Sequence, residues 1–253
     1  TCLCDEACVR VSMLGCHFDV TERKKDELQI QRINRFYAAL SKTNEAIVRV
    51  TDADSLYRRV CEIAVDTAGF VLAWIGKPDG DHISVAASYG PARDYLDGIP
   101  VSTRPALPEG RGPSGHAFRN GERHICNDLN QGPAMPPWLE KAARFGIRSS
   151  AVFPLRKAGQ IIGLLNVYAG EADVFQQAEI DLLNEMALDI SFAMEHLQQQ
   201  SDLRLAMTAL HDSKLKLEQR VKQRTGELET AMNRAEAADR VKSAFLATMS
   251  HEF

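Results

Sequence analysis

Apolar side chains recur at helical spacing in two segments in the first third of the chain. The first stripe repeats every three or four positions and predicts a long helix. It consists of Ile33, Tyr37, Leu40, Asn44 and Ile47. The second segment predicts a shorter helix that Asp52 or Asp54 can cap and that ends by Gly69. Its buried face is expected to comprise Leu56, Val60, Ile63 and Ala64.

The spacing then changes to that of β-strands. FVLAWIG is a short continuous apolar run, HISVAASYG alternates, and PDGD between them is a turn, so residues 70–90 predict a hairpin. Two further strands, SSAVFPL and IIGLLNVYA, are joined by the polar turn RKAGQ. After Phe175 the helical spacing returns. This amphipathic helix is marked by Ile180, Leu183, Ala187, Ile190, Met194 and Leu197.

A segment rich in glycine and proline separates the two hairpins. Residues 91–132 predict an irregular excursion with a short helix at residues 114–119. Another short helix is expected at residues 138–145, with Pro136 and Pro137 at its start and glycine at its end. The order of elements predicts an α+β fold, in which an antiparallel sheet carries helices on one face and a loop region that can cover a cavity on the other.

Composition narrows the classes of function. The 253 residues carry a formal net charge of -4, so we expect no nucleic-acid partner. No apolar run approaches the ~18 residues of a membrane span. We therefore expect a cytoplasmic protein, with a membrane anchor upstream of Thr1 left open. Cys2, Cys4, Cys8 and Cys16 crowd the start of the chain without paired C-x-x-C spacing, which favours reduced thiols over a metal site.

Several motifs in the central part of the chain resemble the GAF domain family. EGRGPSGHAFRNGERHICND contains a Gly-rich loop, a short helix and a strand that ends in Asp. A V-x-P-L strand and a G-x-[IV]-[IV]-G-x-L unit follow, and the resemblance covers roughly residues 35–200. It implies that a small molecule binds between the sheet and the loop region. The residues that would line this site are Trp74, Ser84, His116, Phe118, Asn127, Asp128 and Trp138.

These candidate residues have alternative roles. Trp74 can be an ordinary core residue, and His116 and His124 can be surface or hydrogen-bonded polar groups instead of haem ligands. GAF domains that bind bilins carry a Cys followed directly by His, whereas Cys126 is followed by Asn127, so no covalent chromophore is expected. Many GAF domains bind no known ligand and act as dimerising modules. The sequence therefore leaves the ligand unknown.

The first 25 residues resemble the end of a second kind of sensory domain. Alternating apolar residues from Val9 to Met13 predict a strand, and DVTER follows. This is similar to the D-[IV]-T-[ED]-[RK] motif at the end of PAS domains, where the Asp and the Thr help to hold the sheet to the output helix. By this resemblance Asp19 and Thr21 have structural roles, and residues 1–25 are the C-terminal remnant of a PAS domain.

Helical spacing continues beyond Leu197 for more than 50 residues. Roughly eleven of the fourteen a and d positions of its heptad repeat are apolar. The d positions are Leu203, Leu210, Leu217, Arg224, Ala231, Ala238 and Phe245, and the a positions are Met207, Lys214, Val221, Leu228, Ala235, Lys242 and Met249. One helix cannot bury such a stripe alone, so we predict a parallel dimeric coiled coil and a homodimer. The stripe of the preceding helix slips out of phase near residues 198–202, where we expect the signal to change the winding of the coil.

Residues 242–253, KSAFLATMSHEF, resemble the first half of the H-box of sensor histidine kinases, [KR]-[ST]-x-F-[LI]-A-x-[MV]-S-H-E-[LIF]-R-T-P-[LI]. The resemblance implies that His251 is the phosphoacceptor and Glu252 its acid-base partner. It also implies a response-regulator receiver domain as partner, and a catalytic domain that binds ATP and Mg²⁺. In the heptad frame His251 falls at an outward c position, where a neutral imidazole nitrogen can act as a nucleophile. The ATP-binding domain is not in this sequence, so we expect no autophosphorylation by this chain alone.

These observations predict four segments and one main function. The segments are a PAS remnant (1–25), a GAF sensor domain with a leading linker helix (26–200), a coiled-coil signalling helix (201–240) and the start of the dimerisation and phosphotransfer domain (241–253). The predicted function is the sensory and phosphoacceptor portion of a longer, ATP-dependent two-component histidine kinase. The alternatives are a ligand-binding GAF module that regulates another output, such as a cyclic-dinucleotide enzyme, and a dimerising scaffold without a ligand.

Overall fold

A five-stranded antiparallel sheet is the centre of the fold. The computed structural model describes residues 3–4, 10–11, 21–131 and 136–249. The strands are β3 (Leu72–Asp79), β4 (His82–Tyr89), β5 (His124–Cys126), β6 (Ser149–Lys157) and β7 (Gln160–Ala169), in the order β4-β3-β7-β6-β5. All four neighbouring pairs are antiparallel. The predicted α+β fold and both predicted hairpins are confirmed.

The helices also follow the sequence pattern. They are α1 (Thr21–Arg49), α2 (Ala53–Asp66), α3 (Pro113–Asn120), α4 (Pro136–Arg144) and α5 (Gln177–Met249), with short 3-10 helices η1 (Arg93–Leu96) and η2 (Pro108–Gly110). Asp52 caps α2 by accepting a hydrogen bond from the Ser55 backbone N–H at 2.8 Å. Two short strands, β1 (Leu3–Cys4) and β2 (Arg10–Val11), form a separate antiparallel pair. Among the described helices, none combines the length and the hydropathy needed to cross a bilayer.

The β6–β7 hairpin determines which side chains face the second side of the sheet. Its turn, Ala158–Gly159, has positive φ at both positions (47° and 80°), as tight two-residue hairpin turns require. A β-bulge between Leu155 and Arg156 then shifts the register by one residue. The extra residue is Ile162 on β7, so the bulge exchanges the faces of β7 and brings Tyr168 to the same face as Ser150, its partner on β6.

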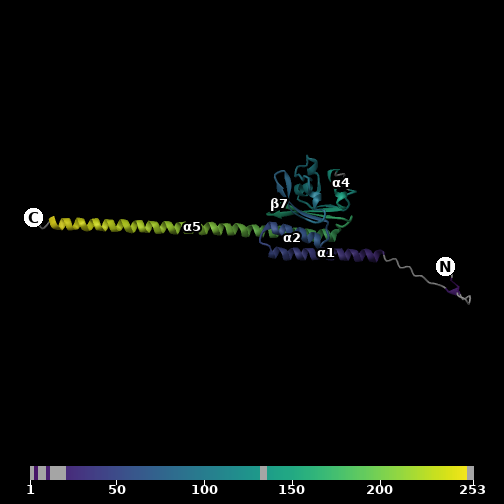
Figure 1. Cartoon of the computed structure of the whole chain (residues 1–253), viewed down its shortest axis with the longest axis horizontal. Coiled ribbons are helices and arrows are strands. Elements are labelled where there is room, and N and C mark those ends of the chain that lie inside the picture. Colours follow the sequence, from purple (N-terminus) through teal and green to yellow (C-terminus); the bar gives the residue numbers. More distant parts are fainter. Residues whose placement is uncertain (1–2, 5–9, 12–20, 132–135, 250–253) are drawn as a thin grey trace. The chain divides into compact units, whose positions relative to one another are not determined.

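The first face of the sheet is covered by α2 and the beginning of α5, and α1 packs against these two helices (Figure 1). The core on this face includes a row of aromatic rings that joins α1 to the start of α5. Phe36 packs edge-on against Phe70 at 5.4 Å between ring centroids, and Phe70 stacks on Phe175 at 5.9 Å. The core on this face is formed by buried side chains of all three helices and of β3, β6 and β7.

The buried stripe of α1 differs from the predicted one. Tyr37 and Asn44 were expected in the stripe but are exposed. The buried residues are instead Phe36, Ala39, Leu40, Thr43 and Ala46. The predicted stripe was therefore rotated on the helix surface, since Phe36 packs against Phe70 and turns the neighbouring Tyr37 outward.

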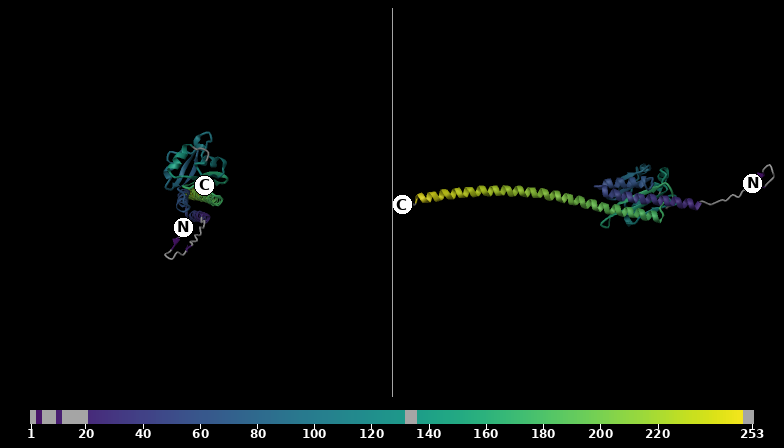
Figure 2. Two further views of the ribbon diagram at one scale, coloured as in Figure 1. Left: turned by 90° about the vertical axis from the view of Figure 1, so that its right-hand side faces the viewer. Right: turned by 90° about the horizontal axis from the view of Figure 1, so that it is seen from below.

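An ion pair connects α1 to the beginning of α5, and these two segments lie side by side (Figure 2). The Arg32 Nε atom is 3.2 Å from Glu179 Oε1. Glu179 has an exposed side-chain fraction of 0%, and Arg32 one of 21%. Neither carboxylate oxygen has a hydrogen-bond partner among the described residues, so Arg32 is the countercharge that compensates this buried carboxylate.

The chain divides into two compact units, residues 1–197 and residues 198–253. In the first unit, α5 contributes Leu183, Met186 and Ile190 to the core. In the second unit, every residue from 198 to 243 is exposed. The apolar residues of this part, from Leu203 to Val241, are therefore not covered by any residue of their own unit that the structure describes. The coiled coil and the domain boundaries drawn from the sequence stay predictions.

Candidate functional site

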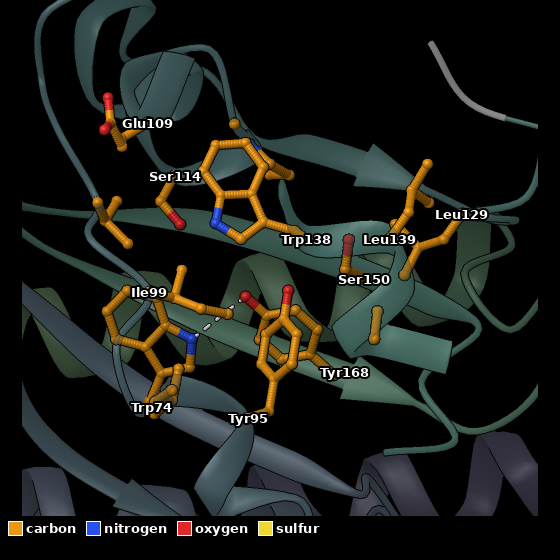
Figure 3. Close-up of a pocket in the computed structure, with 15 residues that line it drawn as sticks. Trp74, Tyr95, Ile99, Glu109, Ser114, Leu129, Trp138, Leu139, Ser150 and Tyr168 are labelled. Atoms are coloured by element: carbon orange, nitrogen blue, oxygen red, sulfur yellow. Dashed lines mark hydrogen bonds between the residues drawn. The ribbon is translucent and has the colours of Figure 1, made fainter. Parts of the chain in front are cut away.

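A cavity lies on the second face of the sheet, beneath η1, α3 and α4 (Figure 3). The volume of this cavity is about 50 Å³. Four aromatic residues line it, namely Trp74, Tyr95, Trp138 and Tyr168. The aliphatic lining is formed by Leu96, Ile99, Val101, Leu129, Leu139 and Ala142. The polar side chains are Glu109, Ser114 and Ser150.

The floor of the cavity consists of strand residues whose positions follow from sheet register. Trp74 on β3 and Tyr168 on β7 share the face, and the indole Nε1 of Trp74 donates a hydrogen bond to the Tyr168 hydroxyl at 3.3 Å. Ser150 on β6 lies opposite Tyr168. Tyr95, from η1, packs edge-on against Tyr168 with 5.6 Å between ring centroids.

Burial keeps the two phenols of the floor protonated. Desolvation raises the pKa of Tyr168 to about 12, although the hydrogen bond from Trp74 acts in the opposite direction. The pKa of Tyr95 is also raised, first by desolvation and then by the neighbouring Tyr168. Both hydroxyls therefore remain neutral hydrogen-bonding groups over the physiological pH range.

Helix α3 is held close to the sheet by one buried hydrogen bond. The Ser114 hydroxyl donates to Asn166 Oδ1 at 2.7 Å, and the Asn166 amide donates to the Leu164 carbonyl at 3.2 Å. Asn166 is fully buried at the centre of β7. On another side of α3, Gly115 permits close approach to η2, because a Cβ there would lie 2.4 Å from the Gly110 carbonyl oxygen. Loss of the hydrogen bond between Ser114 and Asn166 would therefore loosen α3, which forms one wall of the cavity.

Helix α4 forms the opposite wall through Trp138, whose indole lies across the space from Tyr95 and Tyr168 (Figure 3). The indole packs against Gly112, where an added Cβ would lie 3.3 Å from the ring. Lys141 on the same helix donates a hydrogen bond to the Asp97 carbonyl, which ties α4 to the segment after η1. The contact of Trp138 with Gly112 and the hydrogen bond of Lys141 to the Asp97 carbonyl thus position this aromatic wall.

Two polar atoms of the lining have no partner among the described residues. They are Ser150 Oγ, on a residue that is 1% exposed, and Glu109 Oε2, on a residue that is partly exposed. Among the described residues that line the cavity there is no thiol, imidazole, amine or guanidinium group. The lining therefore suits binding of a small molecule better than nucleophilic or acid-base catalysis.

The structure brings two of the seven lining residues expected from the sequence, Trp74 and Trp138, to the cavity. Ser84 lies exposed on β4 and donates to the Lys77 carbonyl at 3.3 Å. Phe118, on α3, packs against the core of the second face without lining the cavity.

Asn127 and Asp128 hold the chain where β5 ends. The Asn127 side chain accepts from the Phe175 N–H and donates to the Phe175 carbonyl, both at 2.9 Å. Asp128 accepts from the Asn130 N–H at 3.0 Å and lies 3.6 Å from Arg148. The contacts of Asn127 connect β5 to the segment that leads into α5, and those of Asp128 connect it to the residue before β6, so both have positioning roles outside the cavity.

His116 and His124 form a pair beside the cavity but do not line it. Their rings meet edge to face with 5.2 Å between centroids, and His116 Nε2 is 3.0 Å from the Asn120 amide. Neither Nδ1 atom has a partner among the described residues. Burial, and to a smaller extent His116, lowers the pKa of His124, so His124 is neutral near pH 7.

The thiols of Cys61 and Cys126 are poor nucleophiles. Burial raises the pKa of Cys61 to about 12 and also raises that of Cys126, which disfavours the nucleophilic thiolate. No cluster of three or more His, Cys, Asp or Glu residues in the described ranges could hold a metal ion. Cys2, Cys8 and Cys16 lie outside the described residues, as do Asp19 and the two residues assigned to phosphotransfer, His251 and Glu252.

Sequence reasoning missed most of the cavity, including Tyr95, Tyr168, Ser114 and Ser150. Strand alternation from a known face would have indicated Tyr168, because it lies two positions after Asn166, the partner of Trp74. Alternation along β6 would have indicated Ser150 as well, because it lies two positions before Val152, which packs on the same face. Tyr95 reaches the floor from an irregular segment, where the sequence carries no periodic signal.

Comparisons with known proteins agree with this fold. The model of the family described as "GAF domain" matches residues 50–195, which is more than half of the chain. Circadian input-output histidine kinase CikA of Thermosynechococcus vestitus is 33% identical over 134 residues, and its counterpart in Synechococcus elongatus is 37% identical over 137 residues. These matches cover 52% and 53% of this chain but 17% of each relative.

Solved structures with similar folds share little sequence with this chain. The free methionine-R-sulfoxide reductase from Neisseria meningitidis, in complex with its substrate, has a TM-score of 0.56 at 19% identity, covering 74% of this chain and 99% of that one. The GAF domain of a phosphoenolpyruvate-protein phosphotransferase from Coxiella burnetii has a TM-score of 0.54 at 12% identity, covering 67% and 98%. At such identities the likeness shows the fold alone.

Proposed function

Because this chain belongs to the GAF domain family, we propose that it is the sensory and phosphoacceptor portion of a two-component histidine kinase. The cavity of the GAF domain binds a small molecule, and the change is transmitted through α5 to His251. The curated relatives support the kinase assignment, since both are histidine kinases and both are similar to this chain over the GAF region.

The observation that carries the proposal is the course of α5. This helix of 73 residues begins in the core of the GAF domain and extends to Met249, two residues before His251. The last part of the chain, KSAFLATMSHEF, is the segment that resembles an H-box. A sensor and a phosphoacceptor sequence are therefore joined by a single helix.

In this proposal His251 accepts the γ-phosphoryl group of ATP. A ring nitrogen of the neutral imidazole forms the new N–P bond, the bond between the β,γ-bridging oxygen and the γ-phosphorus breaks, and ADP leaves. Glu252 takes the proton from the other ring nitrogen. ATP and Mg²⁺ would be held by a catalytic domain that is not in this sequence, and a response-regulator receiver domain would accept the phosphoryl group from His251.

The proposal includes a homodimer that forms through the later part of α5. The exposed apolar side chains of this part include Leu203, Met207, Leu210, Leu217 and Val221, which are 57–72% exposed. A second copy would bury this stripe in a parallel coiled coil, in which the a and d side chains of the two helices interlock. Such a dimer would bring two copies of the phosphoacceptor sequence together.

The test is phosphoryl labelling of the full-length gene product with γ-labelled ATP. We expect acid-labile, base-stable label on the protein, and loss of the label in a His251→Gln variant. His211→Gln is the matched control, since His211 is an exposed histidine on the same helix. Equal labelling of the wild type and the His251→Gln variant would contradict the assignment of His251, and absence of label from the wild type would favour a GAF module that regulates a different output.

A further inference from the structure

The floor of the cavity has hydrogen-bonding capacity that the described residues do not use. Tyr168 accepts from Trp74, and no described residue accepts the proton of the Tyr168 hydroxyl in return. Ser150 Oγ is buried with no partner. In Figure 3 the hydroxyls of Tyr95, Tyr168 and Ser150 point toward the space beneath Trp138. A buried hydroxyl without a partner is costly, so this set favours a ligand that supplies an acceptor.

Charge in the lining disfavours anions. No Lys, Arg or His is found among the described lining residues, and the one charged group is the carboxylate of Glu109. An anion would lose its hydration without gaining a countercharge.

Cations are also disfavoured. The three hydroxyl protons need an acceptor, which an organic cation does not offer. Glu109 Oε2 is buried without a partner among the described residues and calls for a hydrogen-bond donor, which a neutral amide N–H supplies as well as a cation does. Tyr95, Tyr168 and Ser150 are 6%, 8% and 1% exposed, so water hardly reaches them. The hydroxyls of the cavity that lack a hydrogen-bond partner among the described residues therefore favour a ligand with an uncharged hydrogen-bond acceptor.

The volume of the cavity limits the ligand to a few heavy atoms. One water needs about 10–15 Å³ by this measure, and the cavity offers about 50 Å³. The space is therefore equivalent to a small group of waters. Because binding free energy per heavy atom has a ceiling, a ligand of this size is expected to have a dissociation constant no tighter than roughly tens of micromolar.

We propose that the cavity binds a small uncharged molecule with a carbonyl-type acceptor, held by the hydroxyls of Tyr95, Tyr168 and Ser150 beneath the indole of Trp138. This inference rests on the sensory role proposed above and specifies the ligand of that same site. An amide or a ketone of a few heavy atoms has the required shape and polarity. The aromatic and aliphatic walls receive its apolar part, and its oxygen receives the free hydroxyl protons.

The chain provides a selective reporter for this test. It contains two tryptophans, Trp74 and Trp138, and both line the cavity. Protein labelled with 5-fluorotryptophan should therefore give two ¹⁹F resonances that report on the site, which a Trp138→Phe variant assigns. Acetamide, acetate and acetamidinium are the probes, because they have the same number of heavy atoms and similar shapes but different charges.

We expect acetamide to shift both resonances with saturation, and acetate and acetamidinium to leave them unchanged at equal concentration and ionic strength. Ser150→Ala should weaken acetamide binding by about fivefold or more, as loss of one buried hydrogen bond does. Ser84→Ala, on the exposed side of β4, should leave it unchanged. Tyr95→Phe removes one hydroxyl with little loss of volume and serves as a second test if Ser150→Ala disturbs folding.

The outcomes separate this inference from the function on which it rests. Saturable binding of acetate or acetamidinium in preference to acetamide would overturn the uncharged ligand while leaving a ligand cavity in place. No saturable shift with any probe would overturn the inference, whereas labelling of His251 is measured independently. Binding of acetamide that is equal in wild type, Ser150→Ala and Tyr95→Phe would show that the hydroxyls do not hold it.

Discussion

Residues 177–197 and residues 198–249 belong to one helix, yet they have opposite surroundings. In the first part, Leu183 and Ile190 are 0% exposed and pack in the core of the GAF domain. In the second part, Leu203 and Leu210 are 59% and 72% exposed. Both parts are amphipathic in sequence. The difference is that the GAF domain covers the apolar side of the first part, whereas no described residue of its own unit covers that of the second.

The comparison also explains the phase slip noted in the sequence. The first part of α5 carries a second set of apolar residues, Leu188 and Phe192, which are 58% and 71% exposed. Phe192 and Leu203 are eleven positions apart, close to three turns of an α-helix. The heptad repeat that begins at Leu203 thus continues the helical spacing of the exposed residue Phe192. The phase slip arose because the prediction followed the buried residues of the first part instead. That the signal acts at residues 198–202 stays a prediction.

The largest effect is expected from breaking the buried ion pair in the first part of α5. Arg32→Met leaves the Glu179 carboxylate buried without a countercharge and should lower the free energy of unfolding by about 3–5 kcal/mol. Urea unfolding followed by tryptophan fluorescence measures this, because Trp74 and Trp138 both belong to the GAF domain.

The double variant Arg32→Met, Glu179→Met is the control for this prediction. It removes both charges and should restore most of the lost stability, since well-packed apolar residues can replace a buried ion pair at little cost. If the single variant unfolds at the urea concentration of the wild type, Arg32 does not hold α1 against α5, and the two parts of α5 differ less than their burial indicates.

A pair of leucine truncations compares the two parts directly. Leu183→Ala creates a cavity in the core and should cost about 2–5 kcal/mol in the same fluorescence assay. Leu210→Ala makes the same chemical change at an exposed position and should leave the fluorescence transition unchanged. A matching loss in both variants would mean that the second part of α5 contributes to the stability of the GAF domain.

Much of the fold could be predicted because local pattern and tertiary packing agree. Strand alternation and turn residues predicted both hairpins, and the Asp52 cap with its following apolar positions predicted α2. The stripe of α1 could not be predicted in the same way, because residues on two neighbouring faces are apolar. Packing of Phe36 against Phe70 selects the face, and this contact joins residues far apart in sequence.

The cavity was harder to predict than the fold. The two tryptophans were found because bulky residues at the expected positions of a GAF pocket are conspicuous in the sequence. Tyr168 was missed because the extra residue of the bulge, Ile162, exchanges the faces of β7, and an unbroken hairpin would turn Tyr168 to the helix-covered face. A single irregular residue therefore determines that the Tyr168 hydroxyl faces the cavity.

The dissociation constant of the proposed dimer tests the second part of α5 separately from the GAF domain. Leu210→Lys places a charge at a d position of the proposed coiled coil and should raise the dissociation constant of the dimer by about tenfold or more, or about 1.4 kcal/mol. Thr208→Lys adds the same charge at an outward b position and should have little effect. Sedimentation equilibrium at several concentrations measures both. A wild-type chain that is monomeric at tens of micromolar would contradict the dimer itself.

The smallest effect is expected from an exposed ion pair in the second part of α5. Arg240 Nη2 lies 3.8 Å from Glu236 Oε2, and the two side chains are 79% and 61% exposed. Arg240→Ala should lower helix stability by about 0.5 kcal/mol or less, because water and salt already screen the two charges. Circular dichroism during thermal unfolding would detect this small change at low salt, and 1 M NaCl should abolish it. If Arg240→Ala instead costs as much as Arg32→Met, burial would not be the property that separates the two parts of the helix, and a partner that covers Arg240 would have to be sought.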